Sequence, residues 1–86
     1  MTPELLNRSI QAPALRTVLA DDERLAIEKL RLLLESESNV RIVGECRTVR
    51  ETQEAVQRLR PDLLLLDIEM PDGTGFDVLD GLNRGD

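Results

Sequence analysis

Aromatic residues, histidine and cysteine are nearly missing from this sequence. Phe76 is the single aromatic residue among 86, Cys46 is the single cysteine, and histidine is absent. A surface that stacks nucleic-acid bases on aromatic rings is therefore nearly excluded, and so is a zinc site. One cysteine forms no internal disulfide, which fits a reducing compartment, and we expect a cytoplasmic protein. We expect Cys46 to pack as a small, partly buried hydrophobic residue without a redox role.

Excess positive charge and long apolar stretches are also missing. The 17 acidic and 11 basic residues give a net charge of -6, which argues against direct nucleic-acid binding. The longest aliphatic run, Leu63–Leu66, is far too short to span a membrane, and residues 1–11 do not resemble a signal peptide. We therefore expect neither a nucleic acid nor a membrane as a partner. The length allows one domain, and 41% hydrophobic with 33% charged residues favours a globular fold.

The remaining pattern alternates between short apolar runs and helical periodicity. We expect an N-terminal tail over residues 1–14 and a folded domain over residues 15–86. Strands are predicted at Thr17–Ala20, Val40–Gly44 and Leu63–Leu66, and helices at Glu23–Glu35, Thr48–Arg60 and from about Phe76. Such alternation predicts an α/β fold with parallel strands joined by right-handed crossovers.

Two features of the predicted helices have local explanations. Thr48 and Glu51 match a capping box, which marks the start of the second helix. In the first helix, the charged residues follow one stripe, and the apolar arc opposite is broader than a surface helix needs. This arc is centred on Ala26, Leu30 and Leu33 and widened by Leu25, Ile27, Leu32 and Leu34.

Three carboxylates follow two of the predicted strands. Asp21 and Asp22 follow the first strand, and Asp67 follows the third. Ligands of open parallel sheets bind outside the carboxyl ends of the strands, so these acids converge if the two strands are neighbours. Converging carboxylates repel unless a cation is bound, and oxygen ligands alone favour Mg²⁺. The alternatives are that Asp22 is the N-cap of the helix starting at Glu23 and that Asp67 is a turn residue.

Longer motifs around these acids indicate a family. The motifs are Leu19–Glu23, Pro61–Pro71 and Gly75–Leu79. With them, the chain resembles the CheY-like receiver domain of bacterial two-component response regulators from about Arg16 to its last residue. The stretch around Asp67 is most similar to regulators with a LytTR-type DNA-binding output domain. The resemblance implies a flavodoxin-like doubly wound parallel sheet, incomplete here, with three strands in the order 2-1-3.

The resemblance also implies a role for each acid. Asp67 would accept a phosphoryl group from a histidine kinase as an acyl phosphate. Asp21 and Asp22 would hold Mg²⁺, with Asp67 and the main-chain carbonyl of Glu69 completing the protein ligands. Phosphorylation would control transcription through an output domain absent from this chain, so we expect a signalling protein and not an enzyme. The chemistry agrees, because a carboxylate nucleophile needs a cation before an anionic donor can approach.

The chain departs from the family pattern in its length. It has three strand–helix units where a full receiver has five, so the Ser/Thr and Lys that contact the phosphoryl group in the family lie beyond Asp86. We therefore expect a truncated receiver, whether through cloning, proteolysis or a short natural gene. The alternative function is a non-switching interaction module that binds a kinase or another receiver. An aspartate-nucleophile phosphatase fits less well, since no second Asp stands two residues after Asp67.

The third strand would be central in a full receiver but terminal in this chain. Its outer edge, Leu63–Leu66, would then present unpaired N–H and C=O groups to another chain. We expect a homo-oligomer held by antiparallel pairing of these edges or by exchange of helical segments.

Overall fold

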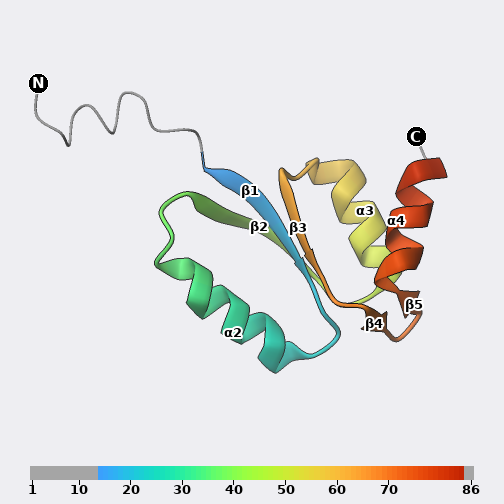
Figure 1. The fold of residues 1–86 in the computed structure, drawn as a ribbon, viewed down its shortest axis with the longest axis horizontal. Helices are drawn as coiled ribbons and strands as arrows, with labels where there is room; N and C mark the ends of the chain where they lie inside the picture. The colour runs from blue at the N-terminus through green and yellow to red at the C-terminus, as the bar shows by residue number, and fades with distance from the viewer. Residues whose placement is uncertain (1–13, 85–86) are drawn as a thin grey trace, which may run out of the picture.

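The computed structural model describes residues 14–84, which form a parallel sheet flanked by helices (Figure 1). Its elements are β1 (Leu15–Ala20), α2 (Arg24–Glu35), β2 (Val40–Cys46), α3 (Val49–Leu59), β3 (Leu63–Leu66), β4 (Glu69–Met70), β5 (Gly73–Thr74) and α4 (Gly75–Arg84). The tail expected at residues 1–14 lies, apart from Ala14, outside the described residues. None of the helices in the described part of the chain has the length and apolar content that crossing a bilayer requires.

The three long strands lie in the order β2-β1-β3, and β1 runs parallel to both neighbours. The predicted order is therefore confirmed. Between β1 and β3, Thr17 pairs with Leu63 and Ala20 pairs with Leu66. Both strands thus end at the same level, and the residues that follow them meet at one edge of the sheet.

The pairing of β1 with β2 contains one irregularity. Thr17 pairs with Ile42, whereas Val18 pairs with Gly44, so Val43 is an extra residue in β2. Such a bulge interrupts the ladder and bends the strand locally. Pairing then resumes and continues to Cys46, two residues beyond the predicted end of this strand.

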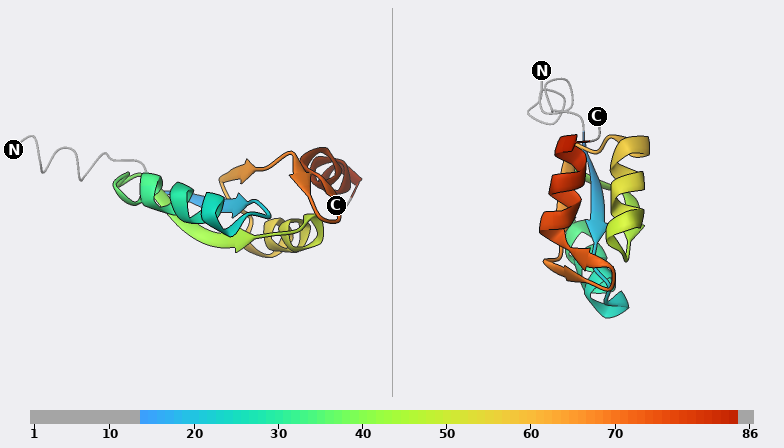
Figure 2. Two further views of the ribbon diagram at one scale, coloured as in Figure 1. Left: turned by 90° about the horizontal axis from the view of Figure 1, so that it is seen from below. Right: turned by 90° about the vertical axis from the view of Figure 1, so that its right-hand side faces the viewer.

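The main core lies between the sheet and the helices α3 and α4. Its buried members are Val18, Ala20, Cys46, Val49, Ala55, Met70 and Val78. Cys46 is 4% exposed, which confirms its expected role as a small packed residue. The two helices lie side by side (Figures 1 and 2), and the Nε2 of Gln53 on α3 donates to the main-chain carbonyl of Asp77 on α4 at 3.3 Å.

The opposite face of the sheet is covered by α2, which lies apart from α3 and α4 in Figure 1. Side chains alternate along β1, so Thr17 and Leu19 face away from the main core, and both are fully buried. The only buried residue of α2 is Ile27.

The predicted centre of the apolar face of α2 is wrong at Leu33. This residue is 70% exposed, and the half-buried Leu30 and Leu34 follow Ile27 at helical spacing along the covered side. The physical reason is packing against the sheet, which buries Ile27. Arg31, paired with Glu45 of β2, flanks this covered side, so the charged stripe lies beside the sheet edge and not directly opposite the sheet.

The structure supports two further local predictions, one of them only in part. Thr48 caps α3, and its Oγ1 accepts a hydrogen bond from the Glu51 N–H at 3.0 Å. The Glu51 carboxylate accepts from the N–H of Arg47 at 2.8 Å, where a standard capping box would use Thr48. All four residues of β3 are half-buried. A run of four leucines predicts a strand covered on both sides. That coverage is only partly present, and β3 pairs with β1 alone among the described residues.

Candidate metal centre

Asp21, Asp22 and Asp67 come together at the carboxyl ends of β1 and β3. One carboxylate oxygen from each residue lies within 4.8 Å of the other two, and all three residues are half-buried. This convergence follows from the register, because Leu66 and Ala20 are paired and each precedes an acid. The prediction that the three acids meet is confirmed.

Main-chain hydrogen bonds hold both acidic loops in place. The Asp67 N–H donates to the Ala20 carbonyl at 2.8 Å, and the Asp21 N–H donates to the Cys46 carbonyl at 3.0 Å. The Asp21 Oδ1 also accepts from the Glu23 N–H at 3.0 Å. Both strand ends are thus fixed before any ligand binds.

The alternative reading of Asp22 as a helix cap is wrong. The N-cap position of α2 is Glu23, whose side chain makes no capping hydrogen bond. The nearby carboxylate that accepts a main-chain N–H in this turn belongs to Asp21. The carboxylate of Asp22 instead belongs to the acidic cluster.

An open hollow of about 570 Å³ lies at these acids. It is lined by Asp22, Glu23, Asp67, Ile68, Glu69, Met70 and Pro71. The carboxylate of Glu69 is not part of the acidic cluster found in the described residues. Glu69 lines the hollow, and the contribution expected from its main-chain carbonyl stays a prediction.

The donor atoms of this cluster fit a hard divalent cation. All three are carboxylate oxygens, and Mg²⁺ takes one or two protein carboxylates while it keeps several waters. Like charges this close disfavour one another, and a bound cation offsets that repulsion. The open hollow leaves space for waters and for a second, anionic ligand.

After Asp67 the chain forms a small antiparallel hairpin, where the residues Met70–Gly75 by themselves predict only a turn. Glu69 pairs with Thr74, and Met70 pairs with Gly73. Gly73 has a φ of +154°, a backbone conformation that side chains disfavour. The hairpin returns the chain to the sheet, so α4 begins directly behind Asp67.

Gly75 allows this close return. A Cβ at Gly75 would lie 2.7 Å from the carbonyl oxygen of Asp67 and 3.1 Å from the Cγ of Leu66. The sequence predicts that Gly75 is a turn or helix-start residue, and α4 begins at Gly75. The structure adds a second reason for glycine, which is direct packing against the backbone of the candidate site.

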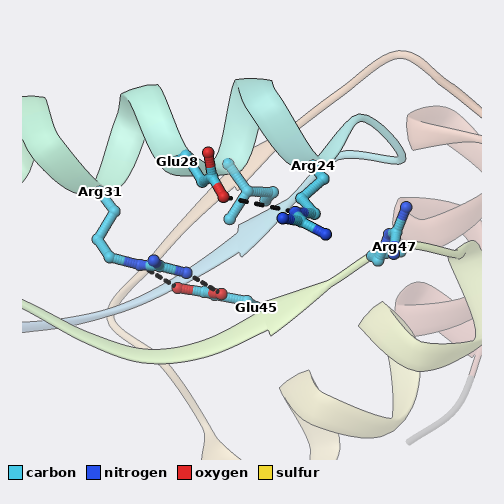
Figure 3. Close-up of a pocket in the computed structure, with 6 residues that line it drawn as sticks. Arg24, Glu28, Arg31, Glu45 and Arg47 are labelled. Atoms are coloured by element: carbon cyan, nitrogen blue, oxygen red, sulfur yellow. Dashed lines mark hydrogen bonds and ion pairs between the residues drawn. The ribbon is translucent and has the colours of Figure 1, made fainter.

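A second hollow, of about 280 Å³, lies between α2 and β2 (Figure 3). It is lined by Arg24, Ile27, Glu28, Arg31, Glu45 and Arg47. The Arg31 guanidinium donates to both carboxylate oxygens of Glu45, at 2.8 and 2.6 Å. The hydrogen bonds to Glu45, together with its negative charge, raise the pKa of Arg31. Arg24 and Glu28 form a looser pair at 3.4 Å, so most of the charge here is used in ion pairs.

Sequence reasoning missed two residues that brace the acidic edge. The Arg47 guanidinium donates to the main-chain carbonyl of Asp22 at 3.3 Å. The Asp72 carboxylate accepts from the N–H of Val49 at 2.7 Å and from the N–H of Arg50 at 3.1 Å. Each contact joins residues that are 22 to 25 positions apart, and no local pattern marks such a pair.

Comparison with known proteins agrees with this geometry. Residues 17–86 match the family model of the response regulator receiver domain. The transcriptional regulatory protein BtsR of Salmonella typhi is 45% identical over 65 residues, which cover 76% of this chain and 27% of BtsR. The sensory transduction protein LytT of Bacillus cereus is 37% identical over 70 residues, or 81% of this chain and 28% of LytT. The chain thus spans little more than a quarter of the length of these relatives.

A solved structure shares the fold. The response regulator domain of Thermotoga maritima CheB superposes with a TM-score of 0.78 and 26% sequence identity, over 84% of this chain and 55% of that one. The flavodoxin-like parallel arrangement predicted from the sequence is therefore confirmed, with three strands in the order 2-1-3. The two relatives also agree with the expected resemblance to LytTR-type regulators.

Proposed function

Because this chain belongs to the response regulator receiver family, we propose that it is a phosphoacceptor domain in which Asp67 receives a phosphoryl group from a histidine kinase. The observation that carries the proposal is the meeting of Asp21, Asp22 and Asp67 within 4.8 Å beside an open hollow. A helix cap or a turn would explain one such acid, but it does not explain three.

The carboxylate of Asp67 is the nucleophile in this proposal. One of its oxygens attacks the phosphorus of a phosphohistidine, and the new O–P bond forms as the N–P bond breaks. The leaving imidazole nitrogen takes a proton from water, and Asp67 is left as an acyl phosphate. Asp67 is half-buried and lines the hollow, so a donor group can approach it from solvent.

The residues that would hold Mg²⁺ are Asp21, Asp22, Asp67 and Glu69, the last through its main-chain carbonyl. When bound, Mg²⁺ neutralises negative charge on the transferred phosphoryl oxygens. The protein contributes preorganised acids, because Asp21 is fixed by its bond to the Glu23 N–H. The main chain of Asp22 is held by the side chain of Arg47.

The wider role belongs to the same proposal. The domain is modified on Asp67 as a cytoplasmic signalling component and does not turn over a substrate as an enzyme. Its phosphorylation regulates transcription through an output domain. The name of BtsR, a transcriptional regulatory protein, supports this role.

The alternative function is a non-switching interaction module that binds a kinase or another receiver. The exposed apolar side chains of α2 favour it, since Leu25, Leu32 and Leu33 are 67 to 70% exposed. The two functions differ in one chemical property. Only the phosphoacceptor forms an acyl phosphate.

The test is labelling of the full chain with acetyl phosphate and Mg²⁺, followed by detection of a hydroxylamine-sensitive phosphate. We expect label on the native chain and none on Asp67→Asn. Asp62→Asn is the matched control, because Asp62 stands at the opposite end of β3, where its carboxylate accepts from the Arg16 N–H at 2.9 Å. Equal labelling of Asp67→Asn, or no labelling of the native chain, would overturn the phosphoacceptor function.

A further inference from the structure

We propose that Asp72 is a positioning residue for the metal centre, which ties the hairpin carrying Glu69 to the start of α3. This inference rests on the proposed function, because it assigns a task to a side chain that touches neither the metal nor Asp67. Its basis is the set of contacts that surround the β4–β5 hairpin.

Asp72 lies at the tip of this hairpin, next to Pro71. The two strands are held by the pairs Glu69–Thr74 and Met70–Gly73. Asp72 is therefore three residues from Glu69 and five from Asp67 along the chain. The tip is thus joined to the main chain of Glu69 through two pairs of residues.

The carboxylate of Asp72 completes the start of α3. Its two oxygens accept from the first two N–H groups of the helix, those of Val49 and Arg50. The next N–H, that of Glu51, donates to the Oγ1 of Thr48. Because the first N–H groups of a helix have no partner within it, Asp72 and Thr48 share the capping of α3 between them. The charge of Asp72 also suits the positive end of the helix dipole.

Apolar packing at the same place reinforces this link. Met70 is 8% exposed and belongs to the same core cluster as Val49. A Cβ at Gly73 would lie 3.2 Å from the Cγ2 of Val49. The hairpin is thus pressed against the residue whose N–H binds Asp72.

The other side of the hairpin is held separately. The N–H and Oγ1 of Thr74 both donate to the carboxylate of Asp77, at 2.8 and 3.2 Å, and the Asp77 N–H donates to the Thr74 Oγ1 at 3.2 Å. These bonds fix the second strand to α4. Asp72 therefore supplies the polar link to α3, and Thr74 with Asp77 supplies the link to α4.

Loss of the Asp72 carboxylate would remove the polar link between the hairpin and α3 and leave Asp21, Asp22 and Asp67 unchanged. The main-chain carbonyl of Glu69 would then be less well placed for Mg²⁺. Residues that orient metal ligands from outside typically change metal affinity 10- to 100-fold. We expect Asp72→Ala to raise the Mg²⁺ concentration for half-saturation by about tenfold, and the labelling rate at saturating Mg²⁺ to stay near that of the native chain.

The experiment compares Asp72→Ala with Thr48→Ala in the full chain. Both variants remove one side-chain cap from the start of α3, but only Asp72 is part of the hairpin. Mg²⁺ binding is measured directly by titration calorimetry, and the initial rate of acetyl phosphate labelling is measured across Mg²⁺ concentrations. Asp72→Asn, which keeps one acceptor oxygen, should fall between the native chain and Asp72→Ala. Amide exchange at Glu69–Thr74 should quicken in Asp72→Ala and not in Thr48→Ala.

The outcomes separate the two proposals. If Asp67→Asn abolishes labelling but Asp72→Ala and Thr48→Ala bind Mg²⁺ equally well, the positioning role is wrong and the phosphoacceptor function stands. A fall in the saturated labelling rate of Asp72→Ala without a change in Mg²⁺ affinity also contradicts the positioning role. If the native chain binds Mg²⁺ but takes no label, the phosphoacceptor function fails, and the binding comparison still decides the role of Asp72. If the native chain binds no Mg²⁺, both proposals fail.

Discussion

The main-chain N–H of Asp67 donates to the carbonyl oxygen of Ala20 at 2.8 Å, which joins β3 to β1 at the residue where β3 ends. The hydrogen bond fixes the distance between the Asp67 main chain and the residue before Asp21. The acids at this edge therefore depend on the backbone behind them, and small backbone shifts there should be measurable at the metal centre.

Gly75→Ala tests this dependence. The new Cβ would lie 2.7 Å from the carbonyl oxygen of Asp67, and a backbone atom cannot move aside as the end of a side chain can. We expect a loss of about 1–3 kcal/mol in the free energy of unfolding, measured by urea denaturation, together with weaker Mg²⁺ binding. Gly44→Ala is the control, because its Cβ would meet side-chain atoms alone, the Cδ1 of Leu59 at 3.1 Å and the Cγ2 of Val18 at 3.5 Å. Equal losses in both variants would show that contact with the Asp67 backbone has no special cost.

Acid titration tests the contact of Asp72 with α3. The N–H groups of Val49 and then Arg50 bind the charged carboxylate and hold the pKa of Asp72 below its usual value of 3.8. A carboxyl group whose pKa is lower in the folded state stabilises the fold at pH values above its unfolded-state pKa. This stability is lost as the pH falls through the folded-state pKa. The stability difference between the native chain and Asp72→Asn should therefore be constant at neutral pH and shrink below about pH 4. A difference that grows in acid would contradict the assignment.

The reactivity of Cys46 tests its packing. Burial raises the pKa of this thiol above its usual value of 9.0, and alkylating reagents attack the thiolate. We expect iodoacetamide at pH 8 to modify the native chain at least about tenfold more slowly than the urea-unfolded chain. Because the pKa of Cys46 is higher in the folded state, the neutral thiol contributes stability to the fold below its unfolded-state pKa. This stability is lost as the pH rises through the folded-state pKa. Equal modification rates in the two states would place Cys46 at the surface.

Self-association through β3 stays a prediction. Among the described residues β3 pairs on one side only, with β1, and its four leucines are half-buried. Leu65→Pro should convert the expected assembly of this chain to monomers, because proline has no N–H and disfavours edge-to-edge pairing. Leu25→Lys, on the exposed side of α2, is the control and should leave it unchanged. Sedimentation of the unaltered chain as a folded monomer at tens of micromolar would contradict the prediction.

Much of the fold was predictable because its signals are local. Leu63–Leu66 is a short apolar run, and the structure gives β3 the same bounds. The convergence of Asp21 with Asp67 followed from the strand order alone. Thr48 was identified as a cap from its spacing to Glu51, and its side chain makes that bond.

The unpredicted features depend on contacts between distant residues. The rotation of α2 depends on how the helix packs on the sheet through the buried Ile27, so helical periodicity alone placed Leu33 on the wrong side. The residues Met70–Gly75 predict a turn, and Asp72 lies in it, but its partners on α3 are 22 to 23 positions away in the chain. Local patterns therefore predicted the acids of the site, but not the residue proposed to position them.

The extra residue in β2 decides which side chains the interior must accommodate. With regular pairing from Thr17 and Ile42 onward, Glu45 would stand opposite Ala20 and point its carboxylate into the apolar core. The bulge instead aligns Glu45 with Leu19 and Cys46 with Ala20. The sequence of β2 is therefore compatible with this fold only with the bulge. Deletion of Val43 would remove the extra residue, and Glu45 and Cys46 would still point to the same faces of the sheet as they do now.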